Sequence, residues 1–150
     1  MNIKEIKSHK KQYLSLLLLA DEQEDMIDRY LDRGTMYVLE DGGVKAECVV
    51  TDEGDGILEI KNIATDPDWQ GMGYGKALIE FIAKQYSGDY SVLQVGTGDS
   101  PLTIPFYEKC GFIRSHIIPN FFTDNYDHLI IEDGVQLVDM IYLRRTLKEK

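Results

Sequence analysis

Short runs rich in apolar and β-branched residues, partly alternating with polar ones, mark the first half of the chain as strand-forming. The predicted strands cover residues 2–6, 35–40, 44–50 and 57–64. Asp41-Gly42-Gly43 separates the second run from the third and favours a tight hairpin turn, and 53–56 is a second turn rich in Gly and acidic residues. The pattern therefore predicts an antiparallel meander that ends with the strand 57–64.

Helical spacing of apolar residues predicts two helices before the hairpin and one after the meander. Ser8 is the predicted N-cap of a helix that ends at Ala20, and 21–31 is the second helix, which Gly34 terminates. The third helix begins near Gly75 and ends at Gly88. Its apolar face consists of Ala77, Leu78, Phe81, Ile82 and Tyr86.

The rest of the chain predicts a short buried strand at 91–95, a helix at 100–110, an extended segment from Gly111 and a last strand at 134–143. Strand, helix and strand in succession around 57–95 predict a right-handed parallel crossover. With 150 residues, 43% of them hydrophobic, the chain is expected to form one domain over 1–150.

Charge and composition exclude several classes of function. The formal net charge of -10 argues against a nucleic-acid-binding surface, which is normally basic. The N-terminus lacks the apolar core of a signal peptide, and the cluster 16–19 is too short to span a bilayer. We therefore expect a cytoplasmic protein with no membrane or nucleic-acid partner, reduced thiols at Cys48 and Cys110, and no metal site among its three scattered histidines.

The segment Gln70-Gly71-Met72-Gly73-Tyr74-Gly75-Lys76 lies between the strand 57–64 and the third helix. Its glycines leave the backbone free of Cβ atoms, so several N–H groups can converge at the positive end of the helix dipole. This geometry predicts a phosphate-binding loop. A Walker A loop is excluded because Ala77 follows Lys76, and a Rossmann loop because a meander precedes it and Gly96 follows the next strand.

Two segments, in this order, resemble those of the GCN5-related N-acetyltransferase (GNAT) family. Residues 62–78 are similar to the family's central strand and its Q/R-x-x-G-x-G/A pyrophosphate loop, with Gln70, Gly73 and Gly75 at the signature positions. The segment Phe106-Tyr107-Glu108-Lys109-Cys110-Gly111-Phe112 is similar to the family's late "lYeklGF" segment. The resemblance implies an α/β (α+β) fold with a mixed, mostly antiparallel central sheet that contains a splayed parallel pair and is flanked by helices.

The resemblance further implies that acetyl-CoA is the cosubstrate and that the acetyl group passes directly to a primary amine of a small molecule, protein or peptide. The central strand supplies backbone groups for the pantetheine arm and the thioester oxygen. Ser100 aligns with an asparagine that the family often uses to contact that arm. The implied cofactor residues are Ile63, Ala64, Thr65, Gln70, Gly71, Met72, Gly73, Tyr74, Gly75, Lys76, Ser100 and Tyr107.

Two catalytic residues follow from the resemblance and from acid–base chemistry. Tyr107 is the expected general acid, because a phenol with a pKa near 10 and a thiol with a pKa near 8.5 exchange a proton at little cost. Glu59 on the central strand is the expected general base, and Glu47 on the neighbouring strand is a competing choice. For either glutamate, a solvent-facing strand position is the alternative explanation.

The connection 118–128 is dense in aromatic and acidic residues and long for a hairpin loop. One interpretation is an acceptor pocket, and the other is a surface loop that its phenylalanines fix to the core. The candidate residues are Phe121, Phe122 and Tyr126 for the walls and Asp124, Asp127 or Glu132 for a cation. His116 and His128 are expected to be strand or loop residues. The segment 121–143 is also similar to that of a bacterial GNAT subgroup.

Three further alternatives remain at this point. A non-catalytic acetyl-CoA sensor or scaffold would keep the same phosphate loop, although Tyr107 and an acidic residue on the central strand favour an enzyme. Transfer of a longer acyl group depends on the space near Val95 and Phe106. A homodimer is compatible with this fold, in which late strands and loops often meet a second copy.

Overall fold

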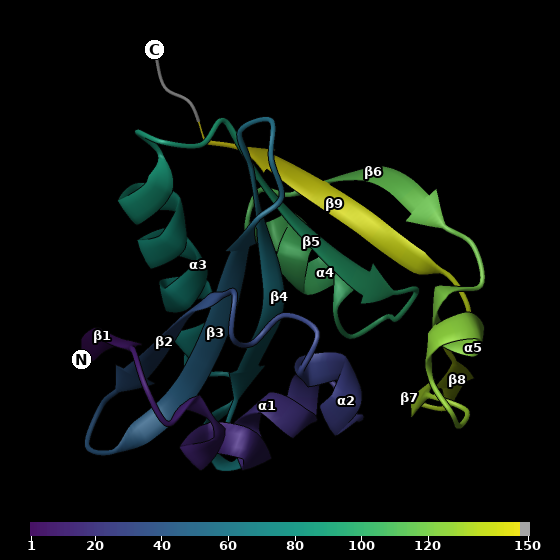
Figure 1. Ribbon diagram of the computed structural model, residues 1–150, viewed down its shortest axis with the longest axis horizontal. Helices are drawn as coiled ribbons and strands as arrows, with labels where there is room; N and C mark the ends of the chain where they lie inside the picture. Colours follow the sequence, from purple (N-terminus) through teal and green to yellow (C-terminus); the bar gives the residue numbers. More distant parts are fainter. Residues whose placement is uncertain (148–150) are drawn as a thin grey trace.

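A mixed seven-stranded sheet runs through the protein in a computed structural model that describes residues 1–147 (Figure 1). The last three residues of the predicted 1–150 domain lie outside the described residues. The strand order is β1-β2-β3-β4-β5-β9-β6, and β4 and β5 form the parallel pair. The strands are β1 (Asn2–Ile6), β2 (Thr35–Glu40), β3 (Val44–Asp52), β4 (Ile57–Thr65), β5 (Val92–Gly98), β6 (Ile113–Ile118) and β9 (Met140–Thr146). The predicted mostly antiparallel sheet is confirmed.

Helices cover both faces of this sheet, and a small two-stranded hairpin lies beyond its end. Helices α3 (Tyr74–Tyr86) and α4 (Ile104–Lys109) pack on one face, whereas α1 (Leu14–Ala20) and α2 (Glu24–Ile27) pack on the other. The remaining elements are η1 (Lys10–Tyr13), η2 (Pro67–Trp69), α5 (Phe121–Asn125), β7 (Ile131–Glu132) and β8 (Val135–Gln136). Figure 1 shows α5, β7 and β8 together at one side of the molecule, past the ends of β6 and β9.

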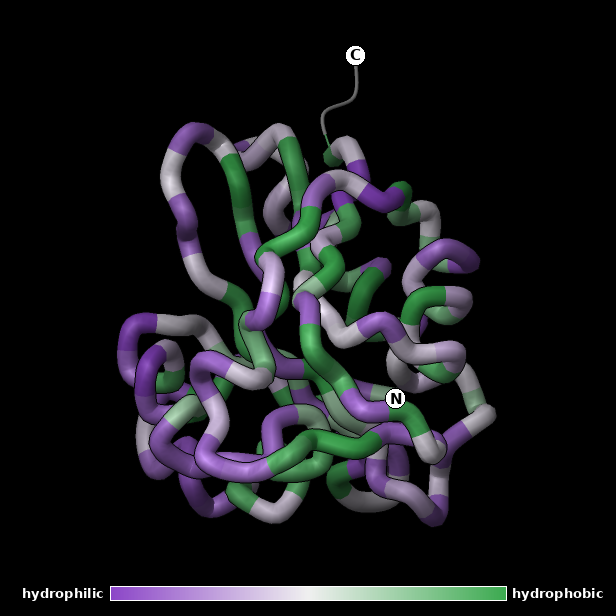
Figure 2. Tube along the Cα trace, turned by 90° about the vertical axis from the view of Figure 1, so that its right-hand side faces the viewer, coloured by the Kyte–Doolittle hydropathy of each residue, from purple (hydrophilic) through white to green (hydrophobic). Residues whose placement is uncertain are grey.

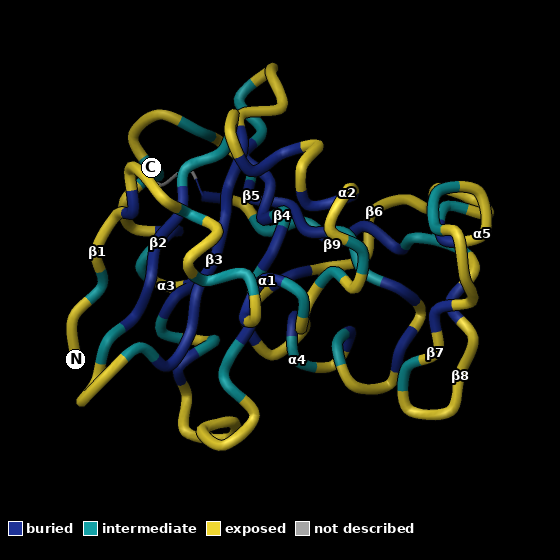
Figure 3. Tube along the Cα trace, turned by 60° about the horizontal axis from the view of Figure 1, so that its bottom comes forward, coloured by how far each residue is buried: buried dark blue, intermediate teal, exposed yellow. Residues whose placement is uncertain are grey.

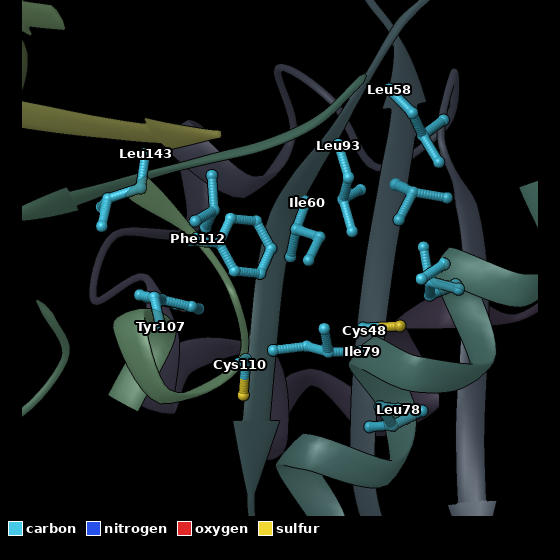
Figure 4. Packing of buried hydrophobic residues seen from close by; sticks show 14 of the residues in the cluster. Cys48, Leu58, Ile60, Leu78, Ile79, Leu93, Tyr107, Cys110, Phe112 and Leu143 are labelled. Carbon is cyan, nitrogen blue, oxygen red and sulfur yellow. The ribbon is translucent and has the colours of Figure 1, made fainter. Parts of the chain in front are cut away.

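The alternation of side chains along the strands divides the core into two layers. On the α3 side, Leu78 and Ile79 contact the sheet residues Ile60 and Leu93 in a cluster that also contains Tyr107 (Figure 4). On the α1 side, a second cluster contains Leu17, Ile27, Met36, Val38 and Val49. The middle strands are therefore buried on both faces, as Figure 3 shows, and the turns between strands are mostly polar (Figure 2).

The parallel pair opens part-way along its length. Residues Ile57–Ile60 of β4 pair with Val92–Val95 of β5, and the pairing stops there. Beyond that point β4 stays paired with β3 and β5 stays paired with β9. Lys61 is an extra residue on β4, because Val49 of β3 pairs with Asn62 and Val50 pairs with Ile60. A bulge of this kind bends a strand, and here it accompanies the divergence of β4 from β5.

The first two predicted helices are shorter and less regular than expected. Ser8 does not cap a helix: η1 begins at Lys10, preceded by His9 with a φ of 53° and no side-chain cap. The second helix spans only Glu24–Ile27 and continues as turns. The positions predicted to be apolar in this segment, Met26, Ile27, Tyr30 and Leu31, are nevertheless all buried. Packing against the sheet thus preserved the predicted face while the backbone departed from a regular helix.

The predicted last strand at 134–143 is two separate strands. Val135–Gln136 pairs with β7 in the small hairpin, and Met140–Thr146 inserts between β5 and β6. The backbone between them forms hydrogen bonds outside the sheet. The Leu137 N–H donates to the Ile130 carbonyl, and the Val138 carbonyl accepts from the Phe122 N–H. The interruption therefore fixes the segment that carries α5 rather than extending the sheet.

Over the residues described, none of the helices has both the length and the apolar composition required to cross a bilayer. Cys48 and Cys110 are both buried, and neither is in a disulfide.

Candidate active site

A cleft with a volume of about 720 Å³ lies where β4 and β5 diverge. Its walls include Ile60–Thr65 of β4 and Val95–Gly98 of β5, and it extends from the glycine loop at one end to α5 and β7 at the other. A cavity of this volume is within the range that proteins use for small ligands and cofactors. Because the pairing of β4 with β5 stops at Ile60 and Val95, backbone groups of both strands face this space.

The glycine loop forms one end of the cleft and leads directly into α3. Gly71 and Gly73 have φ values of 81° and 87°, a region in which other residues are strained, and Gly73 is the N-cap of the helix. The first intrahelical bond runs from the Ala77 N–H to the Gly73 carbonyl. The three preceding N–H groups therefore have no acceptor within the helix, which makes this end a site for an anion such as a diphosphate.

Contacts with neighbouring elements hold the loop in place. The Gln70 side chain donates to the Thr65 carbonyl at the end of β4 over 3.3 Å, and the Tyr74 hydroxyl donates to Asp41 over 2.7 Å. A Cβ atom on Gly75 would lie 3.1 Å from the Phe106 ring, so α3 and α4 approach closely at this residue. The phosphate-binding end of the cleft is thus fixed by β4, by the β2–β3 turn and by α4.

Most of the residues predicted to bind the cofactor lie together along the cleft. The residues that line it are Ile63, Ala64, Thr65, Gln70, Gly71, Gly73, Tyr74, Gly75, Lys76 and Tyr107. Met72 and Ser100 are not among them. The Met72 side chain is 60% exposed, and Ser100 is buried and accepts a hydrogen bond from the Leu102 N–H over 3.1 Å.

Tyr107 of α4 lies in the wall of the cleft and is buried. Its ring packs against Phe106 and Phe112, with centroid distances of 5.2 and 5.7 Å, and Figure 4 shows it beside Phe112 and Cys110. Burial raises the pKa of Tyr107 above its usual range, and the charges of Cys110, Glu132 and Glu47 raise it further. The phenol is therefore protonated at neutral pH, and its raised pKa departs from the close match to a thiol that its ordinary pKa predicted.

Glu59 is buried within a network on the opposite face of the sheet from α3. Its carboxylate accepts hydrogen bonds from Gln94 over 2.7 Å and from the Tyr142 hydroxyl over 3.1 Å. It also pairs with Lys61 at 3.1 Å. Glu59 is not among the residues that line the cleft, although Lys61 is. The network explains why an acidic residue is tolerated on a central strand, and the predicted role of Glu59 as a base stays a prediction.

Glu47, the competing carboxylate, is completely buried on β3 opposite Ala64. Neither of its oxygens has a hydrogen-bond partner among the described residues. Burial raises its pKa well above the usual range, which favours the protonated carboxyl group. It does not line the cleft.

The far end of the cleft is acidic and aromatic. Phe122, Tyr126 and Glu132 line it, as one of the two interpretations of 118–128 predicted, whereas Phe121, Asp124 and Asp127 do not. Phe122 is buried and packs with Ile130 and Leu137, so the segment also has the core contacts that the other interpretation required. His116 stacks on Tyr142, His128 lies near Glu22 at the surface, and neither lines the cleft.

Asp21 and Glu22 also line this end of the cleft, and the sequence did not identify them. Asp21 accepts hydrogen bonds from the Tyr126 hydroxyl over 2.6 Å and from the Tyr30 hydroxyl over 2.9 Å. These contacts tie α5 to the segment after α1. Asp21 and Tyr126 are 105 positions apart, and no local pattern connects residues at that separation.

Within residues 1–147, no group of three or more His, Cys, Asp and Glu side chains is arranged to hold a metal ion.

Comparison with known proteins identifies the family. A family model described as an acetyltransferase (GNAT) domain matches residues 32–114, more than half of the chain. The chain belongs to the GNAT family. The match covers the glycine loop and Tyr107, and it confirms the family predicted from the sequence. This GNAT protein is accordingly an acetyl-CoA-dependent N-acetyltransferase, an enzyme of the acyltransferase class.

Relatives of this GNAT protein share most of its length. An uncharacterized N-acetyltransferase of Bacillus subtilis, YvbK, is 37% identical over 131 residues, which are 85% of this chain and 84% of YvbK. A GNAT acetyltransferase from Elizabethkingia anophelis, whose crystal structure has acetyl-CoA bound, is 32% identical in sequence to this chain. The two structures superpose with a TM-score of 0.91, and the alignment covers 97% of each chain. A structure described as an IAA acetyltransferase from Bacillus cereus is 38% identical, with a TM-score of 0.90 and coverage of 97% and 98%.

Proposed function

We propose that the cleft transfers the acetyl group of acetyl-CoA directly to a primary amine of a small molecule or peptide, with both substrates bound at once. The observation that carries this proposal is the continuity of the cleft, which runs from the start of α3 past Tyr107 to an acidic, aromatic end. One end suits a diphosphate and the other suits an ammonium group. Tyr107 lies in the wall between them.

The cofactor end uses main-chain groups more than side chains. In this proposal the N–H groups of residues 71–76 bind the pyrophosphate, and Ile63, Ala64 and Thr65 bind the pantetheine arm and the thioester oxygen. One preorganised N–H donor at a developing oxyanion contributes about 3 kcal/mol to catalysis. Met72 would act only through its backbone, and Ser100 only by holding the turn before α4. The acetyl-CoA bound to the Elizabethkingia relative supports this assignment.

Tyr107 is the proposed general acid for the departing CoA thiolate. Its ring lies in the wall of the cleft and is held there by Phe106 and Phe112. For the base, Glu59 is the proposal made from sequence. Its carboxylate already accepts two hydrogen bonds and pairs with Lys61. These contacts favour a role in which Glu59 positions Lys61 and Tyr142 over one in which it contacts a substrate.

The acceptor end favours a cationic amine over an anionic substrate. Asp21, Glu22 and Glu132 lie there, and the apolar side chains beside them are Phe122, Ile130, Leu137 and Met140. An amine with an apolar substituent would place its ammonium group near the acidic side chains and its substituent against the apolar ones. A net charge of -10 also favours cationic small molecules, and we place the reaction in the cytoplasm.

We further propose that the enzyme forms a homodimer through β6. This strand is at one edge of the sheet, and all six of its residues are exposed. Ile113 and Ile117 are among them, whereas β1 at the other edge carries Lys4 and Glu5 on a five-residue strand. Charged residues on short edge strands oppose pairing with another chain, so β6 is the edge that favours a second copy.

Thermal unfolding with acetyl-CoA, and with NAD and ATP as controls, tests the cofactor assignment. Ligand at a hundred times its dissociation constant stabilises the folded state by about 2.7 kcal/mol. A shift with acetyl-CoA alone is expected, and its absence at saturating concentration would contradict the proposal.

Tyr107→Phe tests the chemistry separately. It should reduce turnover by about 10² to 10³-fold, within the range for loss of a general acid, and leave acetyl-CoA affinity nearly unchanged. Unchanged turnover would remove Tyr107 from the mechanism.

A further inference from the structure

Nearly every titratable side chain of the cleft already has a partner. Asp21 accepts from two tyrosines, Glu22 lies 3.5 Å from His128, Lys61 pairs with Glu59, and Tyr74 donates to Asp41. The Tyr126 hydroxyl is one of the two that donate to Asp21. Lys76 lies at the start of α3, at the end that suits a phosphate. At the acceptor end, the Oε1 atom of Glu132 is left without a hydrogen-bond partner among the described residues.

Glu132 is held at this position by a defined structure. It lies on β7, which pairs with β8 through Glu132 opposite Val135. Its side chain is partly buried, and its Oε1 atom is shielded from solvent with no partner among the described residues. A carboxylate oxygen that is shielded from solvent and has no hydrogen-bond partner is costly unless a ligand or a water completes its hydrogen bonds.

Glu132 lines the same cleft as Tyr107. Its negative charge is one of the causes that raise the pKa of Tyr107, which lies on α4 on another side of the cleft. Glu47 is another of these causes, but Glu47 is itself buried and its own pKa is raised well above the usual range. Glu132 is therefore the carboxylate within the cleft that Tyr107 senses.

We propose that Glu132 is the catalytic residue of the acceptor side: its carboxylate binds the acceptor ammonium and takes one proton from it before attack on the thioester. This inference rests on the proposed amine acceptor. It assigns the base to a residue of the small hairpin that follows α5, in place of Glu59 or Glu47 on the sheet.

The proton balance of this step closes within the cleft. The ammonium gives one proton to Glu132 and becomes a neutral amine, whose nitrogen then bonds to the thioester carbon. The C–S bond breaks, and the thiolate takes the proton of the Tyr107 hydroxyl. The tyrosinate takes the second proton from the new amide nitrogen, and Glu132 releases its proton to solvent. The products are the acetylated amine, CoA and one proton.

The same assignment couples the pKa of Tyr107 to the charge of Glu132. Burial raises the pKa of Tyr107 most, and the negative charge of the Glu132 carboxylate raises it further. When Glu132 takes the proton of the ammonium, that charge disappears, and Tyr107 becomes a stronger acid. Deprotonation of the acceptor thus promotes protonation of the leaving group.

A matched pair of variants tests the proposal. Glu132→Gln removes the base and keeps its shape, whereas Asp133→Asn removes the same charge from the neighbouring residue, which is exposed and does not line the cleft. The probes are 2-phenylethylamine, 1,4-diaminobutane and lysine amide. Calorimetric titration into the CoA-bound protein measures their binding, with 2-phenylethanol as the uncharged counterpart of the first.

At pH 7 we expect Glu132→Gln to weaken amine binding about tenfold and to reduce kcat/KM about 100-fold, and Asp133→Asn to change neither. Only about one in 10³ molecules of an amine with a pKa near 10 is neutral at pH 7. The activity of Glu132→Gln should therefore recover as the pH approaches 10. This recovery separates a lost base from a damaged fold.

Several results would overturn the assignment. They are wild-type activity in Glu132→Gln at pH 7, a loss that is the same at every pH, a pH-dependent loss in Glu59→Gln alone, or wild-type binding of the amines no tighter than of the alcohol. The acetyl-CoA thermal shift is measured on each variant. If that shift persists while Glu132→Gln behaves as wild type, the inference fails and the proposed cofactor site stands.

Discussion

Glu47 and Glu132 show how differently two unpartnered carboxyl groups behave in one molecule. Glu47 has no exposed surface, lies outside the cleft and has a pKa that burial raises well above the usual range. Glu132 borders the cleft and keeps contact with solvent. The sequence placed Glu47 and Glu59 on adjacent strands near the central loop, but it contained no information on which carboxylate would reach the cleft.

The raised pKa of Glu47 predicts how stability depends on pH. Its folded-state pKa exceeds its unfolded value, so the folded protein holds this proton more tightly, and wild-type stability falls as the pH rises above about 4.3. Glu47→Gln does not titrate. The stability of the variant relative to wild type should therefore increase with pH, by up to about 1.4 kcal/mol per unit, until the folded-state pKa is passed.

Urea unfolding of both proteins at intervals from pH 4 to pH 8 measures this difference. Contributions from the other titrating groups cancel in the comparison, and a constant offset reflects only the contacts of the new amide. Two parallel profiles would contradict the prediction, because they would mean that Glu47 titrates alike in both states.

At the scale of elements, the segments with local signals were predicted well. The β2–β3 hairpin has an Asp-Gly-Gly turn between two β-rich runs, and α3 has a long apolar face after a glycine loop. These patterns depend on residues close together in the sequence, so distant contacts did not change the elements that they predict. Ser8 does not cap the first helix, because His9 beside it adopts a left-handed conformation and is the N-cap. The last strand divided at 137–139 because Leu137 and Val138 bond to Ile130 and Phe122 instead.

The acceptor end of the site depends on such distant contacts. α5 is joined to the segment 21–29 by the Tyr126–Asp21 bond, by Arg29 to Asn125 over 3.2 Å and by the Asp127 N–H to Gln23 over 3.1 Å. The sequence identified 118–128 as a long functional connection but not the side of the protein that it contacts.

Tyr126→Phe should loosen this junction. The variant loses the hydrogen bond to Asp21 and keeps the ring, so we expect faster amide exchange over 119–128 and a KM for the amine raised about threefold to tenfold. The dissociation constant of acetyl-CoA should not change, because the loop and the start of α3 are untouched. Tyr90→Phe is the matched control, since the Tyr90 hydroxyl donates to Asp52 away from the cleft.

Hydrogen–deuterium exchange with mass spectrometry reports the first effect, and steady-state kinetics reports the second. If Tyr126→Phe and Tyr90→Phe are indistinguishable in both, the junction does not shape the acceptor end.

At the scale of the whole molecule, the exposed β6 edge predicts self-association. We expect the wild type to sediment as a dimer at micromolar concentration and Ile117→Lys to sediment as a monomer, because a charge on an edge strand opposes pairing with another chain. Leu129→Lys is the control: Leu129 is 66% exposed but lies outside the strands. A dimer that persists in Ile117→Lys would place the interface elsewhere.

The opening between β4 and β5 has a consequence for aggregation. Unpaired strand edges normally attract other strands, and an outer edge such as β6 offers its hydrogen-bonding groups to any chain that approaches. The two inner edges face each other across a walled cleft, and β3 and β9 cover their outer sides. A small extended ligand can reach them, but a strand of another protein cannot lie alongside. The opening between β4 and β5 thus leaves unpaired strand edges inside the sheet without adding an outer edge at which another chain could pair.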